Sequence, residues 1–383
     1  MRDRVIAATN SALFTGLAIL TAMIVGGIVI VLSDPDTLNE LNEFFSDPFG
    51  AISAAWNTAY AAYKALFDSS LNGVGPLSRT LTEMTPLLFA GLSVALAFRS
   101  GLFNIGASGQ LMIGATCAGY VGFHFDLPDG IHLVAAVLAG LAGGMVWGGI
   151  AGFLKARTGA HEVITTIMLN FIALFLLNYL LTLDAFQRPG RNDPISPPVA
   201  ESARLPELPG PFSVTWGLPL ALLAAAGVWW LLERSTTGFR MRAVGTNPDA
   251  ARAAGMAVGA TYLLAMALAG GLAGMAGTVN VLGRPPYSLI GGFYREIGFD
   301  AIALALVGRS RPLGVVAAAF LFGALKAGST GMQAATDTPV DIIVVIQGLI
   351  IMFVAAPALV SAIWRVKSRG TGPQQFTAGW GAA

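Results

Sequence analysis

The stretch IHLVAAVLAGLAGGMVWGGIAGF, residues 131–153, contains no Asp, Glu, Lys or Arg over its whole length. A helix needs about 20 apolar residues to cross the hydrocarbon core of a bilayer. Within the bilayer a helix is favoured because it satisfies all of its backbone hydrogen bonds internally. The stretch therefore predicts a membrane-spanning helix.

Similar apolar stretches recur on both sides of it. The 383 residues are 55% hydrophobic and only 11% charged, whereas soluble domains carry about 25% charged residues. We therefore expect an all-α, polytopic membrane protein with about ten transmembrane segments, one of them short or broken. The predicted segments are residues 11–32, 81–98, 108–125, 131–153, 163–182, 216–232, 258–282, 299–308, 313–329 and 342–364. Segment 299–308 is too short to cross alone.

Small residues line two of these segments. Gly140, Gly144, Gly148 and Gly152 recur at every fourth position of segment 131–153. One face of that helix is then bare backbone, which lets a neighbouring helix approach closely. Segment 258–282 carries a comparable small-residue face with Ala269, Ala273 and Gly277. These faces predict tight helix packing rather than chemistry.

The first segment follows two arginines, as the apolar core of a signal peptide would. Segment 11–32 is longer than such a core, and no small-x-small cleavage site follows it. We interpret it as a retained span. Between residues 52 and 67, aromatic side chains at helical spacing predict an amphipathic helix on the membrane surface, with a short extra span as the alternative. They are Trp56, Tyr60, Tyr63 and Phe67.

The lysines and arginines beside the predicted segments set the orientation, because such residues gather on the cytoplasmic side. Those that share one side are Arg2, Arg4, Lys155, Arg157, Arg234, Arg240, Arg242, Arg252, Arg309, Arg311, Arg365, Lys367 and Arg369. The expected protein is a single transmembrane domain, residues 1–383, with both termini in the cytoplasm. Residues 33–80 and 183–215 are expected outside and loop 233–257 inside; Arg188, Arg191 and Arg204 are exceptions to the pattern.

One predicted boundary contains an unusual polar sequence, RSGLFNIGASGQ, residues 99–110. Irregular backbone at membrane depth survives only where it is buried in protein or lines a cavity. Phe103 offers an aromatic face, and Asn104, Ser108, Gln110 and Asn170 offer hydrogen-bonding groups for a substrate path. The alternatives are a plain cytoplasmic turn and amides that only tie helices together.

The second unusual sequence is STTGFRMRAVGTNPDAARAAG, residues 235–255. Asn247 can cap a helix that begins at Pro248, with Asp249 in its first turn. So short a helix is unstable alone, and we expect it to dock into a partner, with Ala251 and Ala254 small enough to sit against the partner's backbone. A simple connector is the alternative. The docking segment comprises Asn247, Pro248, Asp249, Ala250, Ala251, Arg252, Ala253, Ala254 and Gly255.

Several functional classes lack their motifs. The sequence has no P-loop motif, no Ser/His/Asp triad or paired-carboxylate pattern, and no basic stripe for nucleic acid. Cys117 is the only cysteine, so a disulfide within the chain is impossible, and His124, His132 and His161 lack metal-ligand spacing. We expect no metal, no cofactor and no enzymatic activity. A channel or secondary transporter stays an alternative, although neither needs a docking helix.

Four blocks carry a family resemblance. They are GLFNIGASGQLMIGA (101–115), VITTIMLNFIA (163–173), FRMRAVGTNPDAARAAGM (239–256) and GFDAIALALVGRSRPLGVVAAAFLFG (298–323). Together they resemble the permease subunits of bacterial ABC importers, a group that also carries ribose and branched-chain amino acids. The FNIG-x-x-GQ and TTIMLN forms are most similar to the nucleoside branch. The resemblance covers about residues 80 to 360.

The resemblance implies a permease subunit of an ATP-driven nucleoside importer in the bacterial plasma (inner) membrane, with simple sugars or branched-chain amino acids as alternative substrates. It implies three partners: a second permease, identical or a sister chain, a cytoplasmic ATP-binding subunit that hydrolyses the ATP, and an extracytoplasmic substrate-binding protein. Residues 248–255 match the coupling helix of the family, and residues 103–110 match its broken segment beside the path.

Overall fold

A computed structural model describes residues 2–291 and 295–365, apart from the side chains of residues 2–12 and 295. Over these residues the regular structure is helical, and β-pairing is confined to two isolated bridges, Ile195 with Ile290 and Glu207 with Thr215. The predicted all-α class is confirmed. The chain forms two compact units, residues 1–83 with 320–383 and residues 84–319.

Every predicted membrane segment coincides with a helix or a pair of helices. They are α1 (Arg2–Ser33), α4 (Val74–Arg99), α5 (Ala107–His124), α6 (Ile131–Thr158), α7 (Glu162–Leu180), α8 (Gly217–Arg234), α11 (Val258–Gly283), α12 (Arg295–Val307), α13 (Pro312–Thr336) and the pair α14 (Asp341–Ala355) and α15 (Pro357–Trp364). Among the described residues, seven helices are long and apolar enough to cross a membrane, and the α14–α15 pair would be an eighth. This agrees with a polytopic membrane protein.

Helices α5 and α12 match the two remaining predicted segments but are not among these candidate spans. Most of α5 is buried, and it packs against α6, α7, α11 and α12 within the second unit. Because protein surrounds α5, its sequence can include polar residues that a lipid-facing helix avoids. Helix α12 is short, as predicted from its sequence.

The last predicted span is not one straight helix. Helices α14 and α15 meet at an 88° bend around Ala356. Pro357 has no amide hydrogen to donate and disfavours helical geometry at the residue before it, so the helix breaks there. Trp364 Nε1 donates to Thr21 Oγ1 of α1, 2.9 Å away, and fixes the end of α15 in the first unit.

The region before α4 folds into two capped helices, α2 (Pro35–Asn42) and α3 (Pro48–Ser70). Trp56, Tyr60 and Phe67 are exposed on α3, whereas Tyr63 turns inward and donates to the Met23 carbonyl at 2.5 Å. Burial raises the pKa of Tyr63 to about 12. The predicted aromatic helix is confirmed, and its place on the membrane surface stays a prediction.

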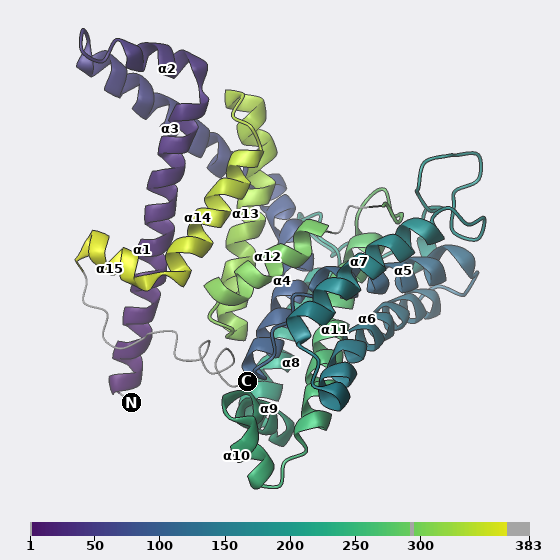
Figure 1. Cartoon of the computed structure of the whole chain (residues 1–383). Helices are drawn as coiled ribbons and strands as arrows, with labels where there is room; N and C mark the ends of the chain where they lie inside the picture. The colour runs from purple at the N-terminus through teal and green to yellow at the C-terminus, as the bar shows by residue number, and fades with distance from the viewer. Residues whose placement is uncertain (1, 292–294, 366–383) are drawn as a thin grey trace. The chain divides into compact units, whose positions relative to one another are not determined.

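The glycine face of α6 packs closely on a neighbouring helix, as predicted, and that neighbour is α11. A Cβ atom at Gly144 would lie 2.3 Å from the carbonyl oxygen of Gly270, and one at Gly148 would lie 2.4 Å from that of Met266. Gly277, on the predicted small-residue face of α11, meets the backbone of α5 in the same way. Figure 1 shows α5, α6 and α11 side by side. Backbone contact among three helices forms the core of the second unit.

The segment between α7 and α8 is anchored to the ends of three helices. The Ala200 amide donates to the Gly122 carbonyl of α5 at 2.8 Å, and His132 Nδ1 of α6 lies 2.7 Å from Ser202 Oγ of η1 (Glu201–Ala203). The Leu205 amide donates to the Leu282 carbonyl of α11 at 2.9 Å. This end of the second unit lies opposite the break between α4 and α5.

Candidate functional site

The break between α4 and α5 begins at a glycine cap. Gly101 has a φ of +71°, and its amide donates to the Phe98 carbonyl while the Leu102 amide donates to that of Ala97. These are the two bonds of a Schellman motif, which ends a helix and needs a residue in the left-handed conformation. The local sequence therefore stops α4 at Arg99 and redirects the chain.

Two of the predicted path residues, Asn104 and Gln110, hydrogen-bond to each other across this break. Asn104 Nδ2 donates to Gln110 Oε1 at 2.9 Å, and Gln110 Nε2 donates to Asn104 Oδ1 at 3.1 Å. Asn104 Oδ1 also accepts the Gly106 amide at 3.0 Å. The two side chains are 0% and 2% exposed. The paired amides join the loop to the first turn of α5, and their oxygen and nitrogen atoms are bonded to protein groups.

Asn170 of α7 braces the same turn from outside. Its Oδ1 accepts the Gly109 amide at 2.8 Å, and its Nδ2 donates to the Ile105 carbonyl at 2.9 Å. Gly109 is in the first turn of α5, where amides have no partner within the helix. Asn170 thus acts as a cap supplied by another helix. Ser108 is buried and packs against Gly298 of α12.

Phe103 lies in the loop between α4 and α5. Its half-buried ring packs on Phe98 with the ring centroids 4.7 Å apart, and its amide donates to Glu162 Oε1 at 3.4 Å. The five predicted path residues therefore gather around one break, where Asn104 and Gln110 tie the loop to α5 and Asn170 ties α7 to both. A role for any of them in contacting a substrate stays a prediction.

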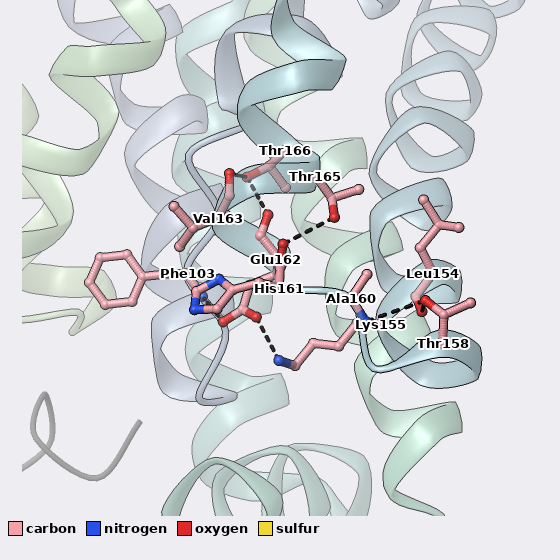
Figure 2. Close-up of polar contacts among 10 residues, drawn as sticks. All are labelled: Phe103, Leu154, Lys155, Thr158, Ala160, His161, Glu162, Val163, Thr165 and Thr166. Atoms are coloured by element: carbon pink, nitrogen blue, oxygen red, sulfur yellow. Dashed lines mark hydrogen bonds and ion pairs between the residues drawn. The ribbon is translucent and has the colours of Figure 1, made fainter. Parts of the chain in front are cut away.

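Sequence analysis missed an ion pair beside this break. Lys155 Nζ of α6 lies 2.5 Å from Glu162 Oε2 of α7, across a short turn (Figure 2). The same nitrogen lies 5.5 Å from the centre of the Tyr262 ring of α11. Glu162 is the first residue of α7, where the helix dipole favours a carboxylate. The detectable sequence feature was an acidic residue opening one span shortly after a lysine closing the previous one.

A second unpredicted contact joins the break to helix α9 (Thr236–Thr246). A Cβ atom at Gly101 would lie 2.6 Å from Gly245 Cα, so the two backbones touch directly. Nearby, Arg99 Nη2 lies 2.7 Å from Glu233 Oε1 at the end of α8. Glycine alone permits so close an approach of two backbones.

Helix α10 (Pro248–Ala253) begins where the sequence predicted. Asn247 Oδ1 accepts the amides of Asp249 at 3.0 Å and Ala250 at 2.9 Å, which confirms the cap. The expectation for Ala251 is wrong, because its side chain is 4% exposed and packs in a cluster with Val244 and Val258. A short helix must cover some apolar surface of its own chain, and Ala251 faces that surface.

The outer face of α10 therefore does not include Ala251. The outer face of α10 presents small side chains and an ion pair in which Arg252 Nη1 lies 2.9 Å from Asp249 Oδ1. The exposed alanines of the segment are Ala250, Ala253 and Ala254. A partner that docks on α10 meets these side chains.

A family model described as "Branched-chain amino acid transport system / permease component" matches residues 77–355. The guanosine ABC transporter permease protein NupP of Bacillus subtilis is 38% identical over 312 residues, covering 81% of this chain and 90% of that protein. The nucleoside ABC transporter permease protein NupB of Lactococcus lactis is 33% identical over 314 residues, 79% and 85% of the two chains. The glucose ABC transporter permease protein TsgB13 of Haloferax volcanii is 31% identical over 347 residues, 88% and 85% of the two. No solved structure matches.

Proposed function

This chain belongs to the family of branched-chain amino acid transport system permease components, and from that premise we propose that it is the membrane-spanning subunit of an ATP-driven nucleoside importer. The observation that carries the substrate class is the 38% identity to a guanosine permease over most of both chains. A separate subunit hydrolyses the ATP, and this chain supplies the passage.

A sugar is the second candidate substrate, because the glucose permease TsgB13 is 31% identical over a longer stretch. Uptake of labelled guanosine, glucose, ribose and leucine separates the candidates in cells that lack this permease and in the same cells with the gene restored. Restored uptake of guanosine, and of no other compound in the panel, is the expected result. Restoration of glucose, ribose or leucine uptake alone would refute the nucleoside assignment.

Three partners follow from the proposed function: a second permease, an ATP-binding subunit and an extracytoplasmic substrate-binding protein. We propose that the ATP-binding subunit docks on the outer face of α10. The support is a capped six-residue helix that presents small side chains outward. A helix this short gains little from its own hydrogen bonds, so surrounding contacts must stabilise it.

Ala253→Arg tests this docking without disturbing the inward cluster around Ala251. An arginine on the outer face should reduce copurification of the ATP-binding subunit and abolish uptake, because an unpaired charge at an interface is costly to desolvate. Ala185→Arg is the matched control, an exposed alanine in the segment between α7 and α8. Normal copurification and uptake by Ala253→Arg would make α10 a simple connector.

For the orientation we propose both termini and loop 233–257 on the cytoplasmic side of a bacterial plasma membrane, with residues 33–80 and 183–215 outside and a single permease domain. The break, Lys155 and α9 lie toward one end of the second unit, which fits the clustering of basic residues in the sequence. Lys367 and Arg369, which support the same orientation, lie outside the described residues.

For the substrate path we propose the break between α4 and α5. Phe103 is the residue proposed to stack on a nucleobase, since its ring is half-buried and aromatic faces bind bases well. Asn104, Ser108, Gln110 and Asn170 are proposed to border the path, where the bonded amides hold the backbone in position. A passage that is only loosely polar is compatible with a separate binding protein that supplies the selectivity.

A further inference from the structure

The segment that leads to the docking helix and the loop of the proposed path meet at a contact between two glycines, Gly101 and Gly245. A Cβ atom at Gly245 would lie 2.6 Å from the amide nitrogen of Gly101 and 2.7 Å from the carbonyl carbon of Ser100. No side chain separates the two backbones. Such a contact is stiff, because atoms already at van der Waals distance cannot approach further without displacement.

On one side, the contact is joined to α10 through a short, well-ordered connection. Gly245 lies in the last turn of α9, and Asn247 both ends α9 and caps α10. Val244 and Ala251 belong to one buried cluster, so α9 and α10 pack against each other as well as following each other in the chain. A force on the outer face of α10 therefore acts on α9 directly.

On the other side, the contact is joined to the start of α5. Gly101 is followed by Leu102, which is fully buried, and by Phe103, whose amide is bonded to Glu162. The paired amides of Asn104 and Gln110 then connect the loop to α5. A shift at Gly101 is thus transferred along a continuous series of packed or hydrogen-bonded groups.

We propose that the contact between Gly101 and Gly245 passes movement of α10 to the break before α5, which makes both glycines positioning residues for ATP-coupled transport. This inference rests on the proposed function and on docking at α10. It adds the point in this chain at which the docking helix acts on the path. A contact that only packs the two segments would not alter coupling.

Gly245→Ala tests the inference, because its methyl group must push the break away from α9. Gly101 is unsuitable, since its φ of +71° would strain an alanine whatever the contact. The complete importer, with its ATP-binding subunit and binding protein, is reconstituted in proteoliposomes, and the ATP hydrolysed per guanosine imported is measured. We expect a several-fold rise in this ratio while assembly and basal hydrolysis are retained.

Gly259→Ala is the matched control, a glycine near the start of α11 where a Cβ atom would lie 3.4 Å from Ala156 Cβ, an ordinary contact. An unchanged ratio for Gly245→Ala, or a loss of uptake that parallels a loss of assembly, would overturn the inference. The parent complex must first show ATP-dependent guanosine uptake; its absence would count against the proposed function instead.

Hydrogen exchange on the parent complex gives a second test that does not depend on any variant folding. Addition of a nonhydrolysable ATP analogue is expected to change amide exchange both in residues 236–254 and in residues 100–106, since the two segments touch at the glycine pair. A change in residues 236–254 that leaves residues 100–106 as they were would show that the contact transmits nothing.

Discussion

At the scale of single residues, the buried amide pair makes the sharpest stability prediction. Replacing Asn104 with alanine leaves the Gln110 amide buried without its partner, at a cost of about 1–3 kcal/mol. Gln110→Ala should cost a similar amount for the same reason. The double variant should lose less stability than the two single variants added together, because neither amide is then buried without its hydrogen-bond partner.

Thermal unfolding in detergent measures this coupling. Asn72→Ala is a suitable control, because the Asn72 amide bonds to Asp68 at an exposed position and should change stability little. If the double variant loses as much stability as the two single variants added together, the two amides do not act as a pair.

Phe103 carries the residue-scale prediction about the path. Phe103→Ala should reduce guanosine uptake or change the preference among nucleosides, while the complex still assembles and hydrolyses ATP. Phe153→Ala, which removes an exposed ring of α6, is the control. Uptake of every nucleoside at the parent rate, or failure only through lost assembly, would place the path elsewhere.

At the scale of elements, the contact between α6 and α11 depends on a bare helix face. A methyl group at Gly144 has no room beside Gly270 and Gly274, so Gly144→Ala must separate the two helices. Overpacking of this kind costs about 1–3 kcal/mol. Gly149→Ala on the same helix is the control, because its Cβ would lie 3.8 Å from Ala267 Cβ.

The measurement is the unfolding midpoint of both variants in one detergent, together with the yield of folded protein. We expect a lower midpoint for Gly144→Ala and an unchanged midpoint for Gly149→Ala. Equal midpoints would show that the contact between α6 and α11 is looser than the backbone distances indicate.

At the scale of the whole molecule, orientation is the property to test. In a background with Cys117 replaced by alanine, single cysteines are placed at Ala254 and Glu201, both of which are exposed. A maleimide that cannot cross membranes should label Glu201→Cys in intact cells and Ala254→Cys only after the cells are opened. The reverse pattern would invert the proposed topology.

At this scale the first helix of the chain also packs against the last two described helices. The first unit combines residues 1–83 with residues 320–383, and α1 packs on both α14 and α15. Contacts this distant in sequence close a very long loop, which costs chain entropy. Sequence reasoning located each of these helices and gave no information on how they pair.

The sequence by itself determined the features that depend on neighbouring residues. Hydropathy predicted a helix at each of the ten segments, because an apolar run is visible in the sequence itself, and seven of these helices, or eight with the α14–α15 pair, are long and apolar enough to cross a membrane. The Asn247 cap and the glycine face of α6 were also predictable, since an N-cap bonds within three residues and a helix face repeats every three to four residues. The family resemblance could also be recognised from sequence alone, because each of its four blocks is a run of consecutive residues.

Only the tertiary structure decided which groups of different helices and loops meet. It turned Ala251 inward onto Val244 and Val258, paired Glu162 with both Lys155 and the Phe103 amide, and brought Gly245 against Gly101. Each contact depends on the direction and depth at which separate helices pack. Helical periodicity shows which residues share a face, but the partner of that face is set by how all the helices fill space together.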